Sequence, residues 1–332
     1  MSETMDLPAT PARVRRLAQL GYLDRAALAR GLWLTGAIPD RAGWARFLDY
    51  LLVALGALFF VSGLFFFVAY NWEDLPRFAR FGILEGAILV ITALAHWSGL
   101  SRIGGKIALT VAALLVGALL AVFGQEYQSG ADSYTLFGNW ALLIAGWVLI
   151  GCFDVLWGIW LGLLNLTLFL FWSQVYPGDQ YPQPESIFLL NAVALLGWEL
   201  MARRFTWWRY RWLQRVTAIV AFGALLWPTL MVIFSLFDEY YELPAIHLYA
   251  PLIYGIFLAL FLLVYTRWRP DLFMVTVALF SVIVVLTALL GRSLSEVDET
   301  LTYFVTGFSV ILQAGVAVTI LRRIAQRWEE TA

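Results

Sequence analysis

The chain has 332 residues, of which 61% are hydrophobic and 14% are charged, and its formal net charge at pH 7 is −1. Soluble globular proteins carry about 25% charged residues, so this composition excludes a soluble globular protein and indicates an integral membrane protein. One cysteine excludes an intramolecular disulfide, and with two histidines it is too small a set for a metal site of nitrogen and sulfur ligands. The sequence has no stripe of basic residues of the kind that binds nucleic acid. We therefore expect no metal, no cofactor and no nucleic acid.

Residues 1–47 form a separate segment with seven arginines and no apolar core of signal-peptide length, so no cleaved targeting signal is expected. Two related stretches, LAQLGYLDRAAL and LWLTGAIPDRAGW, each place a glycine shortly before Asp-Arg-Ala. Glycine suits the position after a helix end and aspartate suits a helix N-cap. The pattern predicts a helix up to Gly21, a second helix from Asp24 to Gly36, and a third from Pro39 or Asp40 into the first membrane span.

Two functions fit this N-terminal segment. It is either a cytoplasmic module that docks a protein, or a basic amphipathic lead-in whose arginines lie near anionic lipid headgroups.

Ten apolar runs follow, each close to the 20 residues that a spanning helix needs. Because backbone polar groups must be satisfied inside lipid, we interpret these runs as helices despite their valine and phenylalanine content. The predicted fold is an all-α polytopic bundle with spans at 48–70, 79–98, 106–124, 135–151, 154–174, 186–202, 213–237, 246–266, 271–290 and 301–321.

The distribution of positive charge predicts the orientation. With a cytoplasmic N-terminus, inner segments hold 19 of the 22 lysines and arginines, and outer segments hold only Arg77, Arg80 and Arg292. Since cytoplasmic segments are enriched in these residues, both termini are predicted to be cytoplasmic. We divide the membrane part into spans one to four (48–151) and a further bundle (152–332).

Glu85 is the first candidate functional residue, because it lies about seven residues, or roughly 10 Å, inside the second span. A charged carboxylate at that depth is costly, so it should face the bundle interior, pair with a cation or stay protonated. Gly82 and Gly86 flank it at a spacing that lets another helix approach closely. The alternatives are a proton or cation site and a structural hydrogen bond to Asn165, Asn191 or a serine.

The second candidate is the outer loop GQEYQSGADSYTLFGNW, which begins at Gly124 and follows the third span. Asp132 suits a helix N-cap and Gly130 suits a turn, so these two residues have a structural explanation. The cluster Gln125, Glu126, Tyr127 and Gln128 has no purely structural explanation. It would bind a cation or polar ligand if another loop supplied partners.

The third candidate is the outer hairpin 71–78, NWEDLPRF, which lies on the same side as the loop 124–134. Most of it is ordinary hairpin chemistry, with Pro76 suited to a helix start and Trp72 to the membrane interface. We expect the two hairpins to pack together near Glu85, with Asn71 as a further ligand. No catalytic motif and no nucleophile beside a base is recognisable, so no catalytic residue is predicted.

The stretches FFFVAYNWEDLPRFAR (65–80) and FGQEYQSGADSYTLFGNWALL (123–143) resemble the bacterial domain-of-unknown-function 2157 family of membrane proteins. The similarity covers roughly residues 11–150. Tyr70 departs from the small residue usual before the Asn-Trp pair. The resemblance implies a bacterial origin and favours treating both outer hairpins as one unit. Together with the ten apolar runs, it leads us to expect a bacterial inner-membrane protein. The matching positions are Ala69, Asn71, Trp72, Leu75, Pro76, Gln125, Tyr127, Gly130, Asp132, Tyr134, Leu136, Phe137, Trp140 and Ala141.

Two functions follow from these features. The first is binding or transport of a small solute or cation through the outer hairpins, with Glu85 and Glu126 as ionisable groups. The second is a non-catalytic subunit or scaffold that holds an envelope protein. Scarcity of charge within the spans favours the second, because proton-coupled carriers use several such groups.

Overall fold

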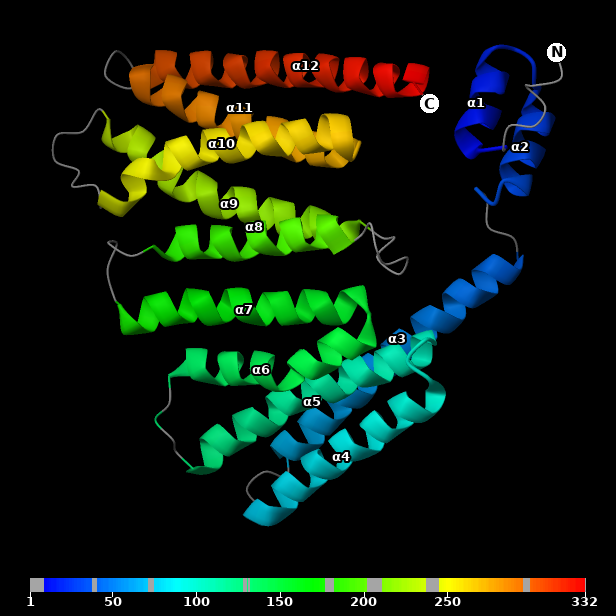
Figure 1. Cartoon of the computed structure of the whole chain (residues 1–332), viewed down its shortest axis with the longest axis vertical. Coiled ribbons are helices and arrows are strands. Elements are labelled where there is room, and N and C mark those ends of the chain that lie inside the picture. The colour runs from blue at the N-terminus through cyan, green and yellow to red at the C-terminus, as the bar shows by residue number, and fades with distance from the viewer. Residues whose placement is uncertain are drawn as a thin grey trace. The chain divides into compact units, whose positions relative to one another are not determined.

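The computed structural model describes residues 9–37, 41–70, 75–127, 130, 132–176, 182–201, 211–236, 245–294 and 299–331. These residues form helices and no strand. Ten of the helices are long and apolar enough to cross a membrane, which confirms the predicted all-α multi-pass fold (Figure 1). The helices are α1 (Pro11–Gln19), α2 (Arg25–Leu34), α3 (Arg41–Tyr70), α4 (Arg77–Ser98), α5 (Ile103–Tyr127), α6 (Ser133–Gly151), α7 (Asp154–Val175), α8 (Gln183–Met201), α9 (Trp212–Ser235), α10 (Ala250–Leu263), α11 (Leu272–Leu294) and α12 (Glu299–Thr331).

The chain divides into two compact units, Met1–Ala118 and Leu119–Ala332. The sequence-based divisions after residues 47 and 151 stay predictions. In the first unit, α1 and α2 form a helical hairpin. The glycines that end its helices and the aspartate that caps the second helix are as predicted. The backbone of Gly21 has φ +80° and that of Gly36 has φ +71°, both in the left-handed region that glycine tolerates. The Asp24 side chain caps α2 by accepting a hydrogen bond from the backbone nitrogen of Ala27 at 2.6 Å.

The hydrogen bonds after each glycine show why these two helices stop. Tyr22 N donates to Leu17 O and Gly21 N donates to Ala18 O, at 2.9 and 3.1 Å. The same pair of bonds recurs after α2 at Gly36 and Ala37, at 3.0 Å each. This arrangement uses helix carbonyls that would otherwise lack a partner, and it reverses the chain direction.

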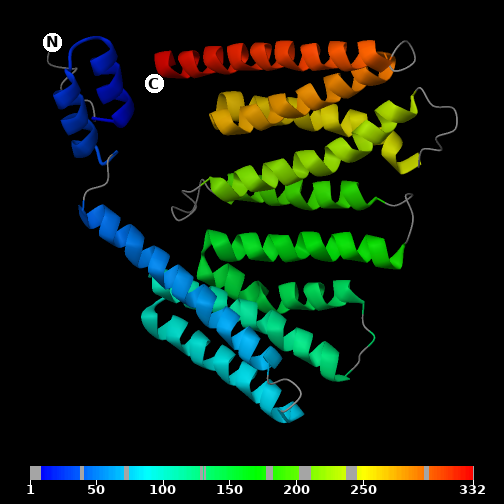
Figure 2. The same cartoon turned by 180° about the vertical axis from the view of Figure 1, so that it is seen from behind.

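The second unit packs its helices largely in chain order. Helix α6 packs against α7, α7 against α8, and α8 against α9; α9 then contacts both α10 and α11, and α11 contacts α12. Figure 2 shows the same order from behind. A core of aromatic and aliphatic side chains joins α8 to α11, and it includes Phe222, Tyr254, Phe261, Tyr265 and Met274.

Helix α10 does not end regularly. It continues into a wide π-helical turn, Val264–Trp268, where Arg269 N donates to Val264 O at 2.8 Å, five residues back. Such turns often mark functional positions, because they redirect a side chain relative to the regular helix. Here the turn carries Tyr265 and leads directly to Arg269 and Asp271.

Candidate functional site

Glu85 is exposed on α4. Phe78, Gly82 and Leu89 lie at helical spacing from it and are exposed as well, whereas Leu84 faces the other way and is buried. The packing of the first unit therefore does not bury Glu85. Its expected alternative partners, Asn165 and Asn191, bond to each other: Asn191 Nδ2 donates to Asn165 Oδ1 at 2.6 Å.

The outer loop begins later than predicted, because α5 continues through Tyr127. Gln125 and Tyr127 are exposed and Glu126 is half-buried, so these three residues occupy the last helical turn. The Tyr127 ring packs against Phe123 with ring centroids 4.6 Å apart. Asn71 lies outside the described residues, and the packing of the two hairpins against each other stays a prediction.

Asp132 stands directly before α6, as expected of an N-cap residue, but its side chain makes no cap hydrogen bond. Its backbone oxygen accepts a hydrogen bond from Thr135 Oγ1 at 2.6 Å instead. The exposed carboxylate therefore lacks the capping role that the sequence suggested. Gly130 has φ +58°, which fits its predicted place in a turn.

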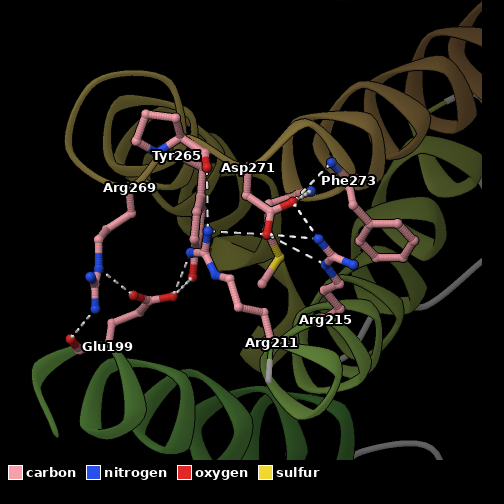
Figure 3. A network of polar contacts seen from close by, with 9 residues as sticks. Glu199, Arg211, Arg215, Tyr265, Arg269, Asp271 and Phe273 are labelled. Atoms are coloured by element: carbon pink, nitrogen blue, oxygen red, sulfur yellow. Dashed lines mark hydrogen bonds and ion pairs between the residues drawn. The ribbon is translucent and has the colours of Figure 1, made fainter. Parts of the chain in front are cut away.

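A cluster of charge that the sequence interpretation missed joins four helices of the second unit (Figure 3). We call it the arginine–carboxylate network. It lies where α8 ends, α9 begins, the π-helical turn ends and α11 begins. By the predicted topology this end of the helices is cytoplasmic. Its members are Glu199, Arg211, Arg215, Tyr265, Arg269 and Asp271.

Glu199 accepts hydrogen bonds from three side chains. Tyr265 OH and Arg211 Nη2 donate to its Oε1 at 2.9 and 3.3 Å, and Arg269 Nε donates to its Oε2 at 3.0 Å. Arg269 Nη2 also donates to the backbone oxygen of Glu199 at 3.3 Å. The end of α8 is thus tied to the π-helical turn by both side-chain and backbone acceptors.

Asp271 is the more deeply buried carboxylate, with 2% of its side chain exposed. Arg211 Nη1 lies 3.2 Å from its Oδ2, and Arg215 Nη2 lies 3.2 Å from each carboxylate oxygen. Asp271 Oδ1 also accepts the backbone N–H of Phe273 at 3.0 Å, which caps the first turn of α11. The Asp271 side chain therefore both caps the start of α11 and forms ion pairs with two arginines.

Arg211 bridges the two carboxylates, and its guanidinium lies 5.7 Å from the centre of the Tyr265 ring. Removing one partner of a buried ion pair leaves an uncompensated charge, so such a network holds its helices in one register. Three arginines against two carboxylates leave one excess positive charge. The arrangement presents no activated nucleophile, and its chemistry is that of a structural clamp.

At the opposite end of α8 lies a second contact between two ionisable side chains. His247 Nδ1 lies 2.6 Å from Glu185 Oε1, and the imidazole is buried. Midway along the helices, the Asn165–Asn191 pair and the Tyr254–Ser281 hydroxyl pair, at 2.9 Å, add polar contacts. Among the described residues, no group of three or more His, Cys, Asp or Glu side chains could hold a metal ion.

Arg203 stands four residues after Glu199, at the usual spacing for an ion pair along one helix, but it lies outside the described residues. The partners that the structure gives Glu199 are 12 to 70 positions away along the chain. One signal was available: Asp271 is an acidic residue directly after the inner basic stretch RWRP. A lone acid in a basic segment is a candidate ion-pair partner.

Comparison with known proteins gives one match. Residues 15–157 match the family described as "Predicted membrane protein (DUF2157)". This range contains both motifs that carry the resemblance. No curated protein and no solved structure matches the chain. The chain is therefore a multi-pass membrane protein, and its residues 15–157 are similar to the DUF2157 family of predicted membrane proteins.

Proposed function

We propose that the protein is a non-catalytic subunit of a cell-envelope complex, embedded in the bacterial inner membrane with both termini in the cytoplasm. In this function it holds a partner membrane protein. The observation that carries the proposal is the exposed Glu85 carboxylate on the α4 face, by which we mean Phe78, Gly82, Glu85 and Leu89.

The Glu85 carboxylate needs a polar partner that shields it from lipid. It lies eight residues after Arg77, the first residue of α4, and therefore about 12 Å along the helix. A charged side chain at depth costs at least about 2.5 kcal/mol when it meets only lipid. A partner helix with a cation or hydrogen-bond donor at this level would remove that cost. Gly82 supports such an approach, because no atom lies within 4 Å of where its Cβ would be.

The second unit supports the same function. Its buried ionisable groups in α8–α11 contact one another in the arginine–carboxylate network and the His247–Glu185 pair. Groups engaged in such contacts are poor candidates for a substrate path, which needs polar groups that exchange partners during transport. A rigid bundle of this kind suits an anchor.

The test uses a photoreactive phenylalanine analogue in place of Leu89 in native membranes. Leu94 is the matched control, because it is also exposed, at 49% against 71% for Leu89, yet lies on the other side of α4 from Glu85. We expect one discrete cross-linked protein from position 89 and none from position 94. Glu85→Gln should weaken the product, whereas Asp49→Asn, which neutralises an exposed carboxylate on α3, should not. Equal products at both positions, or an undiminished product with Glu85→Gln, would refute the proposal.

A second candidate function is binding or transport of a small solute or cation through the outer hairpins 71–78 and 124–134. It is favoured by the Asp132 carboxylate, which is exposed and does not cap α6. The ligands would be Glu85, Glu126, Asn71, Gln125, Tyr127 and Asp132. Native mass spectrometry of the gently extracted protein separates the two functions. A small bound species lost in Glu126→Gln, together with flux lost in Glu85→Gln, supports this second function, and a stoichiometric second protein supports the first.

A further inference from the structure

Helix α12 carries two grooves. The first, of about 510 Å³, is formed by α12 alone and runs from Ile311 to Arg323. The second, of about 240 Å³, lies between α11 and α12. The two grooves share a ridge formed by Leu312, Val316 and Ile320. They therefore lie on either side of one row of α12 side chains.

The first groove is apolar along its length and charged at one end. Its walls are aliphatic, and Gly315 leaves its floor open, because no atom lies within 4 Å of where the Cβ of Gly315 would be. The hydroxyl of Thr319 is already used, since it donates to Gly315 O at 2.9 Å. From Ile311 to Arg323 the helix rises about 18 Å.

Arg323 closes this groove and is exposed. No ion pair or hydrogen bond of its guanidinium occurs within the described part of the chain. The second groove is lined by aliphatic side chains and by one polar side chain, Gln313, whose amide nitrogen donates to Ser309 Oγ at 3.2 Å. A ligand with two apolar chains and one anionic group would therefore complement the two grooves and Arg323.

We propose that these grooves bind one diacyl phospholipid with an anionic headgroup. One acyl chain lies on each side of the Leu312–Val316–Ile320 ridge, and the phosphate contacts Arg323. Apolar burial supplies the contact along the chains, and the arginine supplies the preference for negative headgroups. By the predicted topology the headgroup lies in the cytoplasmic leaflet, where the neighbouring inner segments are also basic.

A partner helix is the competing occupant of an apolar groove. The charge at the end of the first groove favours the lipid, because a phosphate complements the guanidinium, whereas the one other polar side chain of that groove, Thr319, already donates its hydroxyl to Gly315 O. Two grooves flanking one ridge also match the two chains of a phospholipid. This inference is independent of Glu85 and of the proposed partner on α4.

The experiment measures lipid bound to the full-length protein by native mass spectrometry in a neutral detergent. Phosphatidylglycerol is titrated against phosphatidylcholine with the same acyl chains. We expect one phosphatidylglycerol per chain, bound about fivefold more tightly than phosphatidylcholine, since one arginine supplies the discrimination. Arg323→Gln should abolish this preference. Arg322→Gln removes the same charge from the adjacent exposed position outside the grooves and should keep it.

A second pair of variants tests the grooves without changing charge. Gly315→Leu should fill the first groove and reduce retention of both lipids. Gly307→Leu is its control, because Gly307 lies on the same helix with equally open space and does not line the groove. The proposal would be overturned if the protein bound the two lipids equally and Arg323→Gln did not change that binding, since this result indicates ordinary annular lipid. A stoichiometric protein released by Gly315→Leu would overturn it in favour of a helix site.

Discussion

At the scale of single residues, the second unit depends on a few buried polar groups with several tasks each. Asp271 receives two arginines and also caps α11, while Arg211 joins both carboxylates of the network. Tyr265 gives its ring to the hydrophobic core and its hydroxyl to Glu199. Such residues are costly to replace, because each substitution breaks more than one contact.

Asp271 allows these tasks to be separated. Asp271→Ala removes the ion pairs and the cap, and should lower the free energy of unfolding by about 3 kcal/mol, the low end for a buried pair because its arginines are partly exposed. Asp271→Asn keeps an oxygen that accepts the N–H of Phe273, so its loss of unfolding free energy should be about 1 kcal/mol smaller than that of Asp271→Ala. Thermal and denaturant unfolding in micelles, followed by tryptophan fluorescence, checks both values.

The control is Asp132→Asn, which neutralises an exposed carboxylate that forms no cap hydrogen bond. It should leave the unfolding midpoint unchanged. If Asp271→Ala behaved like this control, the network would contribute nothing to stability.

At the scale of elements, the α1–α2 hairpin shows how local chemistry specifies a small structure. Glycines in the left-handed region end both helices, and Asp24 starts the second. The hairpin closes where Val14, the buried residue of α1, packs on Gly31 of α2. This contact leaves no space for a side chain on Gly31.

The contact predicts an unusual outcome for a glycine-to-alanine change in a helix. Alanine normally stabilises a helix interior by up to about 1 kcal/mol. In Gly31→Ala, however, the new Cβ would lie 2.7 Å from Val14 Cγ1, and a β-branched valine cannot easily move away. We expect faster amide hydrogen exchange over residues 11–34, because overpacking costs about 1–3 kcal/mol.

Two variants make this result specific. Gly56→Ala on α3 meets no atom within 4 Å and should not accelerate exchange. Adding Val14→Ala to Gly31→Ala should restore protection, since it removes the clashing methyl group. Unchanged exchange in the single variant Gly31→Ala would show that the hairpin is not closed by this contact.

At the scale of the whole molecule, the ten helices agree with the ten apolar runs, but their direction across the membrane rests on charge. The prediction places both termini in the cytoplasm and Asp132 outside. In a Cys152→Ser background, a membrane-impermeant maleimide should label Asp132→Cys in intact cells with a permeable outer membrane. Ala9→Cys and Thr331→Cys should react only after the inner membrane is opened. Labelling of either terminus in intact cells would contradict the predicted topology.

The sequence by itself determined the features that arise from local chemistry and from the solvent. Lipid requires about 20 apolar residues per span, so the number of helices and their approximate bounds followed from hydropathy. Backbone conformation at Gly21 and Gly36 followed from the absence of a Cβ, and the cap at Asp24 from a carboxylate close to free N–H groups. The two motifs around residues 65–80 and 123–143 were enough to indicate the family that matches residues 15–157.

Tertiary structure alone decided which distant side chains meet. Glu199 and Asp271 find arginines up to 70 positions away, and the pairing depends on helix order and on the π-helical turn, which no local pattern specifies. The exposed side of α4 and the grooves of α12 also depend on which faces the neighbouring helices cover. Hydropathy cannot supply this information, because in lipid both the buried and the exposed faces of a helix are apolar.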